Sequence, residues 1–342
     1  MKLLVTGGCG FIGSNFIRYW LEKYPNDEVV NLDLLTYAGD VSILADVEQN
    51  AGDRYSFVRG DIADAALVLF LLTSRRIDVV VNFAAESHNS RALLDPAVFA
   101  RTNVVGTQTL IEAARRAGVA RFHHISTCEV FGDMDLDSTT PFTEDSPYRP
   151  RTPYNASKAA ADLLVRAYST TFETPVSLSI SCNNYGPWQH PEKVIALFTS
   201  NAIEDQPLPV YQNSHHRREW LHVLDHCRAI DAIVMRGRVG QTYNIGSGDE
   251  RTVEDIANAV LDALGKPRSL KRYVPDRPGH DRRYLLDHRK IRSELGWKPE
   301  IRFADGLRDT VAWYAEHGSW WKKRKQDVIA ELDEFAWKAI TR

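Results

Sequence analysis

The sequence predicts an α/β protein built on a doubly wound parallel sheet, and three observations support this fold class. Short runs rich in β-branched residues alternate with stretches of 3.6-residue hydrophobic periodicity through the first half of the chain. A glycine-rich turn follows the first run and opens a helix. The chain has 342 residues, of which 44% are hydrophobic, so it can bury a large core. This alternation predicts helices on both faces of a parallel, Rossmann-type sheet.

Six short apolar runs are candidates for the strands of this sheet. Each is rich in β-branched or aromatic residues and lies between turn or helix signals. They are LLVTG (3–7), EVVNLD (28–33), YSFVRGD (55–61), VVVNFAA (79–85), FHHIST (122–127) and VSLSIS (176–181).

A helix is predicted to begin at Pro96. Asp95 is a suitable N-cap, and proline is favoured in a first helical turn because its missing N–H would have no partner there. Gly118 is a typical stop signal. We therefore expect a helix between these two positions.

The pattern changes near residue 183, which predicts a second, smaller domain. From there, mixed loops and helices carry several prolines and glycines, as in YGPWQHPEK and DRPGHDRR. We expect residues 1–182 to form the Rossmann domain, with 219–249 returning to it. Residues 183–218 and 250–342 are expected to form a mixed α/β domain folded onto the sheet.

Charge and apolar patterns argue against several classes of partner. The net charge is −3 and basic residues are scattered, apart from a WWKKRK run near the C-terminus, so no footprint for nucleic acid stands out. No apolar stretch has the length of a membrane span, and the chain starts on a strand pattern instead of a signal peptide. We expect a cytoplasmic protein that binds neither nucleic acid nor membrane.

The cysteines and histidines form no recognised metal motif. The four cysteines are far apart and in no CxxC spacing, which argues against a disulfide framework or a structural zinc site. The histidines at positions 215, 216, 222 and 226 likewise lack a metal-binding spacing. We therefore expect free thiols and no metal.

The stretch TGGCGFIGS, residues 6–14, predicts a dinucleotide site. Gly7, Gly10 and Gly13 form a GxxGxxG pattern between the first strand and a helix, with Phe11 and Ile12 inside it. One glycine makes the tight turn, another lets the backbone approach a pyrophosphate, and the third permits close helix packing. The helix N-terminus then presents free N–H groups to the phosphates. A tight turn without a ligand is the alternative for this motif taken alone.

Residues at the ends of the next strands favour NAD as the ligand. Asp33 ends the second strand, where a carboxylate can accept hydrogen bonds from the adenosine ribose hydroxyls. The same charge would repel the 2′-phosphate of NADP. Asp61, followed by Ile62, could meet the adenine or could instead cap a helix. Ala84 and Ala85 are small where a cofactor would pass close to the sheet edge.

Tyr154 and Lys158, in PYNASK, are candidates for an oxidising pair. Four residues apart on a predicted helix, they lie on one face a turn apart. Tyrosine is a poor base at neutral pH, but a neighbouring ammonium and a positive nicotinamide ring both favour the phenolate. Tyr154 is therefore a credible base for removing a hydroxyl proton while hydride leaves the same carbon. The glycine motif and Asp33 argue against the alternative, an exposed helix pair.

Motifs along nearly the whole chain resemble those of the extended short-chain dehydrogenase/reductases, and most closely the dTDP-glucose 4,6-dehydratases. They include TGGCGFIGS, AAESH, TNVVGT, SKAAADLLVRAY, NNYGPWQHPEK, TYNIGS and DRPGHDRRY. The resemblance implies that Tyr154 oxidises the sugar at C4, that Lys158 holds the nicotinamide ribose, and that Thr127 hydrogen-bonds near the C4 oxygen. It also implies tightly bound NAD and a homodimer that pairs through the helices from about Pro96 and from Tyr154.

The resemblance further implies that the second domain binds the nucleotide sugar, with dTDP-glucose favoured and a UDP-sugar as the alternative. Two arginines can clamp a diphosphate with forked donors, and other side chains add neutral or charged donors. The implied substrate-binding residues are Ser87, Thr127, Asn183, Lys193, Arg218, Arg277 and His280.

STCEVFG, residues 126–132, departs from the dehydratase pattern at a catalytic position. In these relatives Thr, Asp and Glu stand side by side; the Asp protonates the departing C6 hydroxyl and the Glu removes the C5 proton. Here Thr127 and Glu129 are kept, but Cys128 replaces the acid. A protonated thiol could supply the proton, or Glu129 could take the C5 proton and deliver it to the C6 oxygen. A nucleophilic Cys128 has no histidine base fixed beside it, and simple packing of the thiol is a further alternative.

The product and the class of function also have alternatives. Hydride return to C6 would give a 4-keto-6-deoxy sugar, whereas Cys–Glu also resembles 5,6-dehydratases, in which hydride returns to C4 and an exocyclic alkene remains. SHNSRA, residues 87–92, replaces the usual SHVDRS, so Asn89 and Ser90 could alter the pocket near the sugar hydroxyls. Glu129 argues against a 4-epimerase, which needs no base for C5. The Tyr–Lys pair argues against a non-catalytic NAD-binding scaffold. We therefore favour the 4,6-dehydratase reaction.

Overall fold

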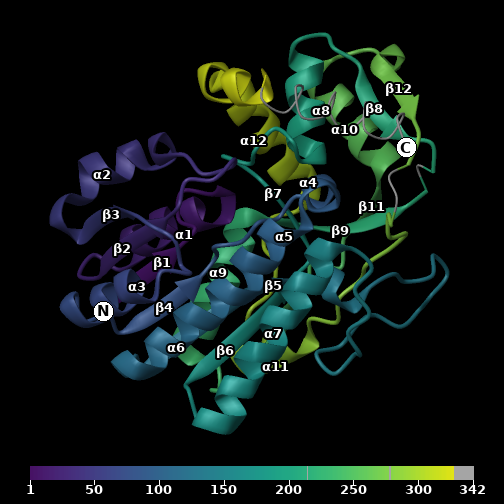
Figure 1. Cartoon of the computed structure of the whole chain (residues 1–342). Helices are drawn as coiled ribbons and strands as arrows, with labels where there is room; N and C mark the ends of the chain where they lie inside the picture. Colours follow the sequence, from purple (N-terminus) through teal and green to yellow (C-terminus); the bar gives the residue numbers. More distant parts are fainter. Residues whose placement is uncertain (214, 277–278, 327–342) are drawn as a thin grey trace.

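The computed structural model describes residues 1–213, 215–276 and 279–326, and its centre is a seven-stranded parallel sheet (Figure 1). The strand order is β10-β6-β5-β4-β1-β2-β3, so β1 and β4 lie side by side where the direction of winding reverses. The prediction of a doubly wound, Rossmann-type α/β fold is confirmed. The strands are β1 Lys2–Thr6, β2 Glu28–Asp33, β3 Tyr55–Arg59, β4 Val79–Asn82, β5 Arg121–Thr127, β6 Val176–Ser181 and β10 Thr242–Ile245.

Side chains of β1 alternate between two hydrophobic cores, one on each face of the sheet. Leu4 belongs to the core that contains Leu110 and Val165. Leu3 and Val5 belong to the core on the other face, with aromatic side chains of α1. Because both faces are buried, the strands are continuous apolar runs instead of alternating ones, as expected for a parallel sheet.

Helices cover both faces of this sheet. On one side α3 packs against α6 and α6 against α7, while on the other side α1 packs against α9 (Figure 1). The helices before residue 183 are α1 Phe11–Lys23, α2 Ala45–Ala51, α3 Ala65–Ser74, α4 Asn89–Leu94, α5 Pro96–Phe99, α6 Thr107–Ala117 and α7 Pro153–Phe172. The 3₁₀-helices are η1 Val41–Leu44, η2 Gly52–Arg54 and η4 Cys128–Phe131, and η3 Ala100–Gly106 is a π-helix.

The helix predicted from Pro96 is present but contains a π-helical segment. It runs as α5, the π-helix η3 and α6, and ends at Gly118 in the left-handed conformation with φ +70°. The start and stop signals are therefore confirmed. Asp95 occupies the N-cap position, as predicted, although its side chain makes no cap hydrogen bond. Within η3, a Cβ on Gly106 would lie 2.7 Å from Ile62 Cδ1, so the helix can approach the loop after β3 only through a glycine.

Elements β7, α8, β8, β9, α10 and α12 share a smaller core of their own (Figure 1). Strands β7 Asn183–Tyr185, β9 Arg217–His222 and β11 Glu250–Thr252 make one sheet, and β8 Leu208–Tyr211 pairs with β12 Lys271–Val274. Strand β10 lies beside β6 in the large sheet. The division into two domains itself stays a prediction. The helices are α8 Val194–Ile203, α9 Val223–Arg236, α10 Val253–Leu264, α11 Arg289–Leu295 and α12 Phe303–Glu316, with the turn η5 Arg268–Leu270.

The cysteine prediction is confirmed: all four thiols, at positions 9, 128, 182 and 227, are free and buried. In the part of the chain that the structure describes, no helix combines the length and the apolar character needed to cross a bilayer. The predicted location stays a prediction.

Candidate active site

The glycine turn joins β1 to α1, as the motif predicts. Gly7 has φ +67°, and a Cβ there would lie 2.7 Å from the backbone nitrogen of Ala84. A Cβ on Gly13 would collide with the carbonyl oxygen of Gly7, so both glycines are required by the packing of the protein itself. Gly8, which the motif did not single out, is also tightly packed, because a Cβ there would collide with the Asn31 side chain.

Gly10 differs from its neighbours in this turn. Among the described residues, a Cβ on Gly10 would have just one neighbour within 4 Å, the Gly7 carbonyl oxygen at 3.3 Å. Packing of the chain therefore does not explain this glycine, whereas close approach of a phosphate group does. The Gly10 carbonyl accepts a hydrogen bond from Ser14 N at 3.0 Å, which starts α1 directly after the turn. This arrangement fits a dinucleotide.

Asp33 ends β2, as predicted, and its carboxylate is tied to the glycine turn. Oδ2 accepts a hydrogen bond from Cys9 N at 2.9 Å, and Oδ1 accepts one from Leu35 N at 2.8 Å. Burial raises the pKa of Asp33. A carboxylate oxygen has more than one lone pair, so these bonds are compatible with the predicted ribose contact.

Asp61 and Ile62 follow β3 and lie next to η3. Asp61 Oδ1 accepts a hydrogen bond from Ala63 N at 2.8 Å, and Oδ2 lies 3.3 Å from an Arg101 nitrogen. The N-cap of α3 is Asp64, so the alternative that Asp61 caps a helix is wrong. The Ile62 side chain is buried against Gly106 and therefore packs beneath η3 instead of lying at the surface.

Tyr154 and Lys158 lie a turn apart on α7, and both are buried. Burial raises the pKa of Tyr154, and so do the neighbouring Glu129 and Cys128, while a hydrogen bond with the Thr127 side chain opposes the rise. Burial also lowers the pKa of Lys158 to about 8, against the charge of Asp162. The Lys158 ammonium donates to the Ile125 carbonyl at 2.7 Å. The expectation that the ammonium and a nicotinamide ring together favour the phenolate stays a prediction.

Glu129 is held by Asn89, a contact that sequence reasoning missed. Asn89 Nδ2 donates to Glu129 Oε2 at 3.0 Å, and Asn89 Oδ1 accepts a hydrogen bond from Thr152 Oγ1 at 2.7 Å. Thr152 in turn caps α7 by accepting from Asn155 N at 3.2 Å. The start of the helix that carries Tyr154 is thus linked to the Glu129 carboxylate through one asparagine. The signal available in the sequence was the departure SHNSRA.

Cys128 points into the main core. Its side chain is 1% exposed and belongs to the same cluster as Val130 and Phe131. Burial, followed by the charges of Glu129 and Glu219, raises its pKa well above the ordinary value. The thiol is therefore protonated at neutral pH, which argues against a nucleophilic thiolate.

Arg218 is buried at a junction with residues 281–284. Its guanidinium donates to the Arg217 carbonyl at 2.7 Å and to the Asp281 carbonyl, and it lies 4.7 Å from the centre of the Tyr284 ring. The Asp281 side chain accepts hydrogen bonds from the Tyr284 hydroxyl and from Asn155 at 3.4 Å. Asp281 thus links the neighbour of Tyr154 to the predicted diphosphate clamp. Sequence reasoning missed it, although it lies within DRPGHDRRY.

The other predicted substrate residues lie in three places. Lys193 Nζ donates to the Ser87 carbonyl at 3.0 Å, and the buried Asn183 Oδ1 has no hydrogen-bond partner among the described residues. His280 lines a 520 Å³ pocket with His216 and with three arginines and Asp133. Arg277 lies outside the described residues.

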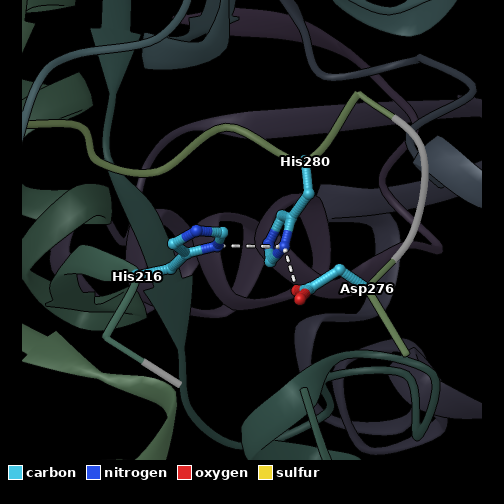
Figure 2. A group of neighbouring side chains, drawn as sticks. All are labelled: His216, Asp276 and His280. Carbon is cyan, nitrogen blue, oxygen red and sulfur yellow. Dashed lines mark hydrogen bonds and ion pairs between the residues drawn. The ribbon is translucent and has the colours of Figure 1, made fainter. Parts of the chain in front are cut away.

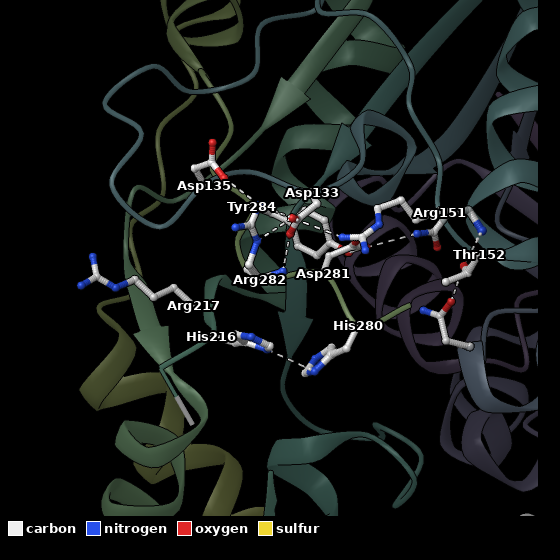
Figure 3. A network of polar contacts seen from close by, with 12 residues as sticks. Asp133, Asp135, Arg151, Thr152, His216, Arg217, His280, Asp281, Arg282 and Tyr284 are labelled. Atoms are coloured by element: carbon white, nitrogen blue, oxygen red, sulfur yellow. Dashed lines mark hydrogen bonds and ion pairs between the residues drawn. The ribbon is translucent and has the colours of Figure 1, made fainter. Parts of the chain in front are cut away.

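The wall of this pocket is a network of ion pairs (Figure 3). Asp133 pairs with Arg151 at 3.2 Å and with Arg282 at 2.6 Å, and Arg151 also lies 3.4 Å from Asp281. The network connects the pocket to the α7 N-terminus and so to Tyr154. A basic pocket joined to a buried Tyr–Lys pair suits an anionic substrate with a reactive hydroxyl.

Comparisons with known proteins agree with this site. The family model GDP-mannose 4,6 dehydratase matches residues 4–310. The dTDP-glucose 4,6-dehydratase of Streptomyces niveus is 47% identical over 329 residues, which is 95% of this chain and 96% of the relative. DesIV (dTDP-glucose 4,6-dehydratase) from Streptomyces venezuelae, solved with NAD and TYD bound, superposes with a TM-score of 0.91 at 49% identity over 95% of this chain and 100% of that chain. A UDP-glucose 4-epimerase from Thermotoga maritima has a TM-score of 0.85 at 26% identity over 92% of this chain and 99% of that chain. The resemblance stated from the motifs is confirmed, and the chain belongs to the GDP-mannose 4,6 dehydratase family.

Proposed function

We propose that this protein is an NAD-dependent dTDP-glucose 4,6-dehydratase. The reaction oxidises the sugar at C4, expels water across C5 and C6, and returns hydride to C6. The observation that carries the proposal is the cluster of Thr127, Glu129 and Tyr154 at the end of β5, because it combines a base for the C4 hydroxyl with a base for C5. Sequence identity of 47–49% over nearly the whole chain to proteins named dTDP-glucose 4,6-dehydratase supports this nucleotide sugar as the substrate.

The cofactor is NAD, held by the glycine turn, Asp33 and Lys158. When bound, NAD supplies the acceptor and donor of hydride and a positively charged ring. Residues of the chain transfer the protons. Tyr154 takes the proton of the C4 hydroxyl, and Thr127, already hydrogen-bonded to that phenol, steadies the developing phenolate. Burial keeps bulk water from the reacting oxygen.

We assign the elimination of water to Glu129 alone. Asn89 holds Oε2, so Oε1 is the candidate atom to remove the C5 proton once C4 is a ketone. The same proton is then delivered to the C6 oxygen as the C6–O bond breaks, and water leaves. The alternative donor, Cys128, is buried in the main core cluster with Val130 and Phe131 and is a weak hydrogen-bond donor.

The decisive test uses dTDP-glucose labelled with deuterium at C4. We expect purified protein to form a 4-keto-6-deoxy sugar with the label at C6. The product and the position of the label are determined by mass spectrometry and NMR. Label retained at C4 beside an exocyclic alkene would establish the 5,6-dehydratase reaction instead. Absence of turnover with dTDP- and UDP-sugars alike would favour the binding-only alternative.

We also propose that the protein is a homodimer paired through α5, η3 and α7. These helices pack together, and they expose Val98 (41%), Val105 (52%) and Leu163 (57%). Leu163→Glu should therefore yield a monomer in light scattering coupled to size-exclusion chromatography. Phe70→Glu, at a 64% exposed position on α3, is the matched control and should leave the dimer intact. A monomeric parent protein, or a dimeric Leu163→Glu variant, would contradict the proposed interface.

A further inference from the structure

A row of buried polar side chains crosses the large sheet from the last residue of β1 to α7. Thr6, Asn82 and His124 stand at paired positions on β1, β4 and β5, so their side chains lie on one face of the sheet. Thr6 Oγ1 donates to Asn82 Oδ1 at 2.6 Å, and Asn82 Nδ2 lies 3.1 Å from His124 Nδ1. The other ring nitrogen of His124, Nε2, lies 3.4 Å from Asp162 Oδ1 on α7. All four side chains are buried.

The hydrogen bonds of this row are oriented toward Asp162. Asn82 Oδ1 accepts from Thr6, so the amide N–H group of Asn82 faces His124 Nδ1, and that nitrogen accepts. Burial, followed by the charge of Lys158, lowers the pKa of His124 to about 4, so the ring is neutral at neutral pH. A neutral imidazole carries a single proton, which is therefore on Nε2, the nitrogen that faces Asp162.

Asp162 therefore holds a buried negative charge that the row does not neutralise. Its Oδ2 accepts hydrogen bonds from Ser126 Oγ at 2.6 Å and from the Tyr148 hydroxyl at 3.0 Å. With donors facing both oxygens, the carboxyl group has no acceptor for a proton of its own. The Arg166 guanidinium donates to the Tyr148 hydroxyl at 3.0 Å instead of to the carboxylate. A fully buried charge of this kind is costly unless a counter-charge lies nearby.

The ammonium group of Lys158 is the counter-charge within reach. Lys158 lies one helical turn before Asp162 on the same face of α7. The two side chains bind consecutive residues of β5, because Lys158 Nζ donates to the Ile125 carbonyl at 2.7 Å while Asp162 accepts from Ser126. The charge of Asp162 raises the pKa of Lys158, against the burial that lowers it to about 8. Without that charge the ammonium would lose its proton close to neutral pH.

We propose that Asp162 is a positioning residue, the buried counter-ion that keeps Lys158 in its ammonium form. The proposed function places Lys158 at the nicotinamide ribose, and an ammonium there also favours the Tyr154 phenolate. The consequence for the reaction rests on the proposed function, whereas the coupling of Asp162 to Lys158 does not. Thr6, Asn82 and His124 hold the counter-ion in place from beneath the cofactor site.

The test is a titration of Lys158 in the full-length protein, labelled with ¹³C at the lysine Cε atoms and followed by NMR without substrate. Lys158→Met identifies the Lys158 signal. In Asp162→Asn the midpoint of that signal should fall by roughly 1–3 pH units, the usual effect of a nearby opposite charge. Asp231→Asn is the matched control, because it removes a buried carboxylate that pairs with Lys23, and it should leave the Lys158 midpoint unchanged. An unchanged midpoint in Asp162→Asn would overturn the proposal.

Thermal unfolding gives a second readout. Lys158→Met leaves the Asp162 charge buried without its counter-ion, so the variant should unfold at a lower temperature than the parent at neutral pH. Addition of Asp162→Asn removes that charge, and the double variant should unfold at a higher temperature than Lys158→Met alone. A double variant no more stable than Lys158→Met would contradict the pairing. Neither measurement requires turnover, so its failure is distinct from failure of the dehydratase assignment.

The role of this pair in the reaction is tested by the pH–rate profile. Because Lys158 would lose its proton earlier in Asp162→Asn, the fall in rate at alkaline pH should begin at a lower pH than in the parent. The same substitution at Asp231 should leave the profile unmoved. An alkaline limb in Asp162→Asn identical to that of the parent would contradict the role at the nicotinamide ribose.

Discussion

Tyr154→Phe is expected to reduce dehydration of dTDP-glucose by roughly 10² to 10⁴-fold, the range for loss of a positioned acid–base group. The variant keeps the ring, which packs edge-on against Phe99 with ring centres 6.2 Å apart, and loses only the hydroxyl. Its effect therefore reports proton transfer at C4 instead of packing. The measurement is the rate of 4-keto product formation at saturating substrate.

Tyr168→Phe is the matched control for that result. Tyr168 lies on the same helix, is equally buried at 9% exposure, and accepts a hydrogen bond from Gln108 at 3.0 Å. Removing its hydroxyl should leave turnover within a few fold of the parent. Calorimetry with NAD should show binding in both variants. Comparable turnover in Tyr154→Phe and Tyr168→Phe would remove the phenol from the mechanism.

Glu129→Gln is expected to reduce the rate of elimination by roughly 10² to 10⁴-fold, whereas Cys128→Ser should reduce it by less than about 10-fold. The amide cannot take the C5 proton, while serine preserves the small size of a side chain that packs into the core. Exchange of the C5 proton with D₂O separates the steps, and it should vanish in Glu129→Gln. The reverse pattern, a collapse in Cys128→Ser with activity kept in Glu129→Gln, would assign the proton to the thiol.

Asn89→Val adds a graded test of the same carboxylate. The variant removes the donor to Glu129 Oε2 and restores the valine of the SHVDRS pattern. A hydrogen bond to a charged group contributes about 1.5–3 kcal/mol, so loss of this donor should slow exchange of the C5 proton with D₂O by roughly 10- to 100-fold. An exchange rate equal to that of the parent protein would show that Asn89 does not position Glu129.

The sequence predicted the large sheet well because its strands are local, continuous apolar runs. It also placed Tyr154 and Lys158 on one helix, since a four-residue spacing fixes that relation without knowledge of the fold. The runs at 55–61 and 79–85 overran β3 and β4, because composition does not show where the chain leaves the hydrogen-bonded ladder. The π-helical η3 was missed as well; it includes Gly106, which packs on Ile62.

The contacts that refine the site were not predictable from local pattern. Asn89 meets Glu129 across 40 residues, and Asn155 meets Asp281 across 126. Such pairs depend on how α4, α7 and the loop after β12 pack together. The grouping of His216 with His280 (Figure 2) has the same origin, because the two residues lie 64 positions apart in the sequence. Sequence therefore proposed the candidate catalytic residues individually, and the fold determined which of them touch.

The double use of Asp33 bears on any redesign of cofactor preference. A common route toward a phosphorylated dinucleotide removes the acidic residue that faces the ribose. Here that carboxylate also accepts a hydrogen bond from Cys9 N, inside the glycine loop that we propose binds the pyrophosphate. Exchanging Asp33 for a neutral side chain would remove its repulsion of a ribose 2′-phosphate. The same exchange would remove the hydrogen bond that holds the glycine loop. Selectivity and affinity are thus coupled through a single side chain, and a compensating hydrogen-bond acceptor would have to be introduced with the exchange.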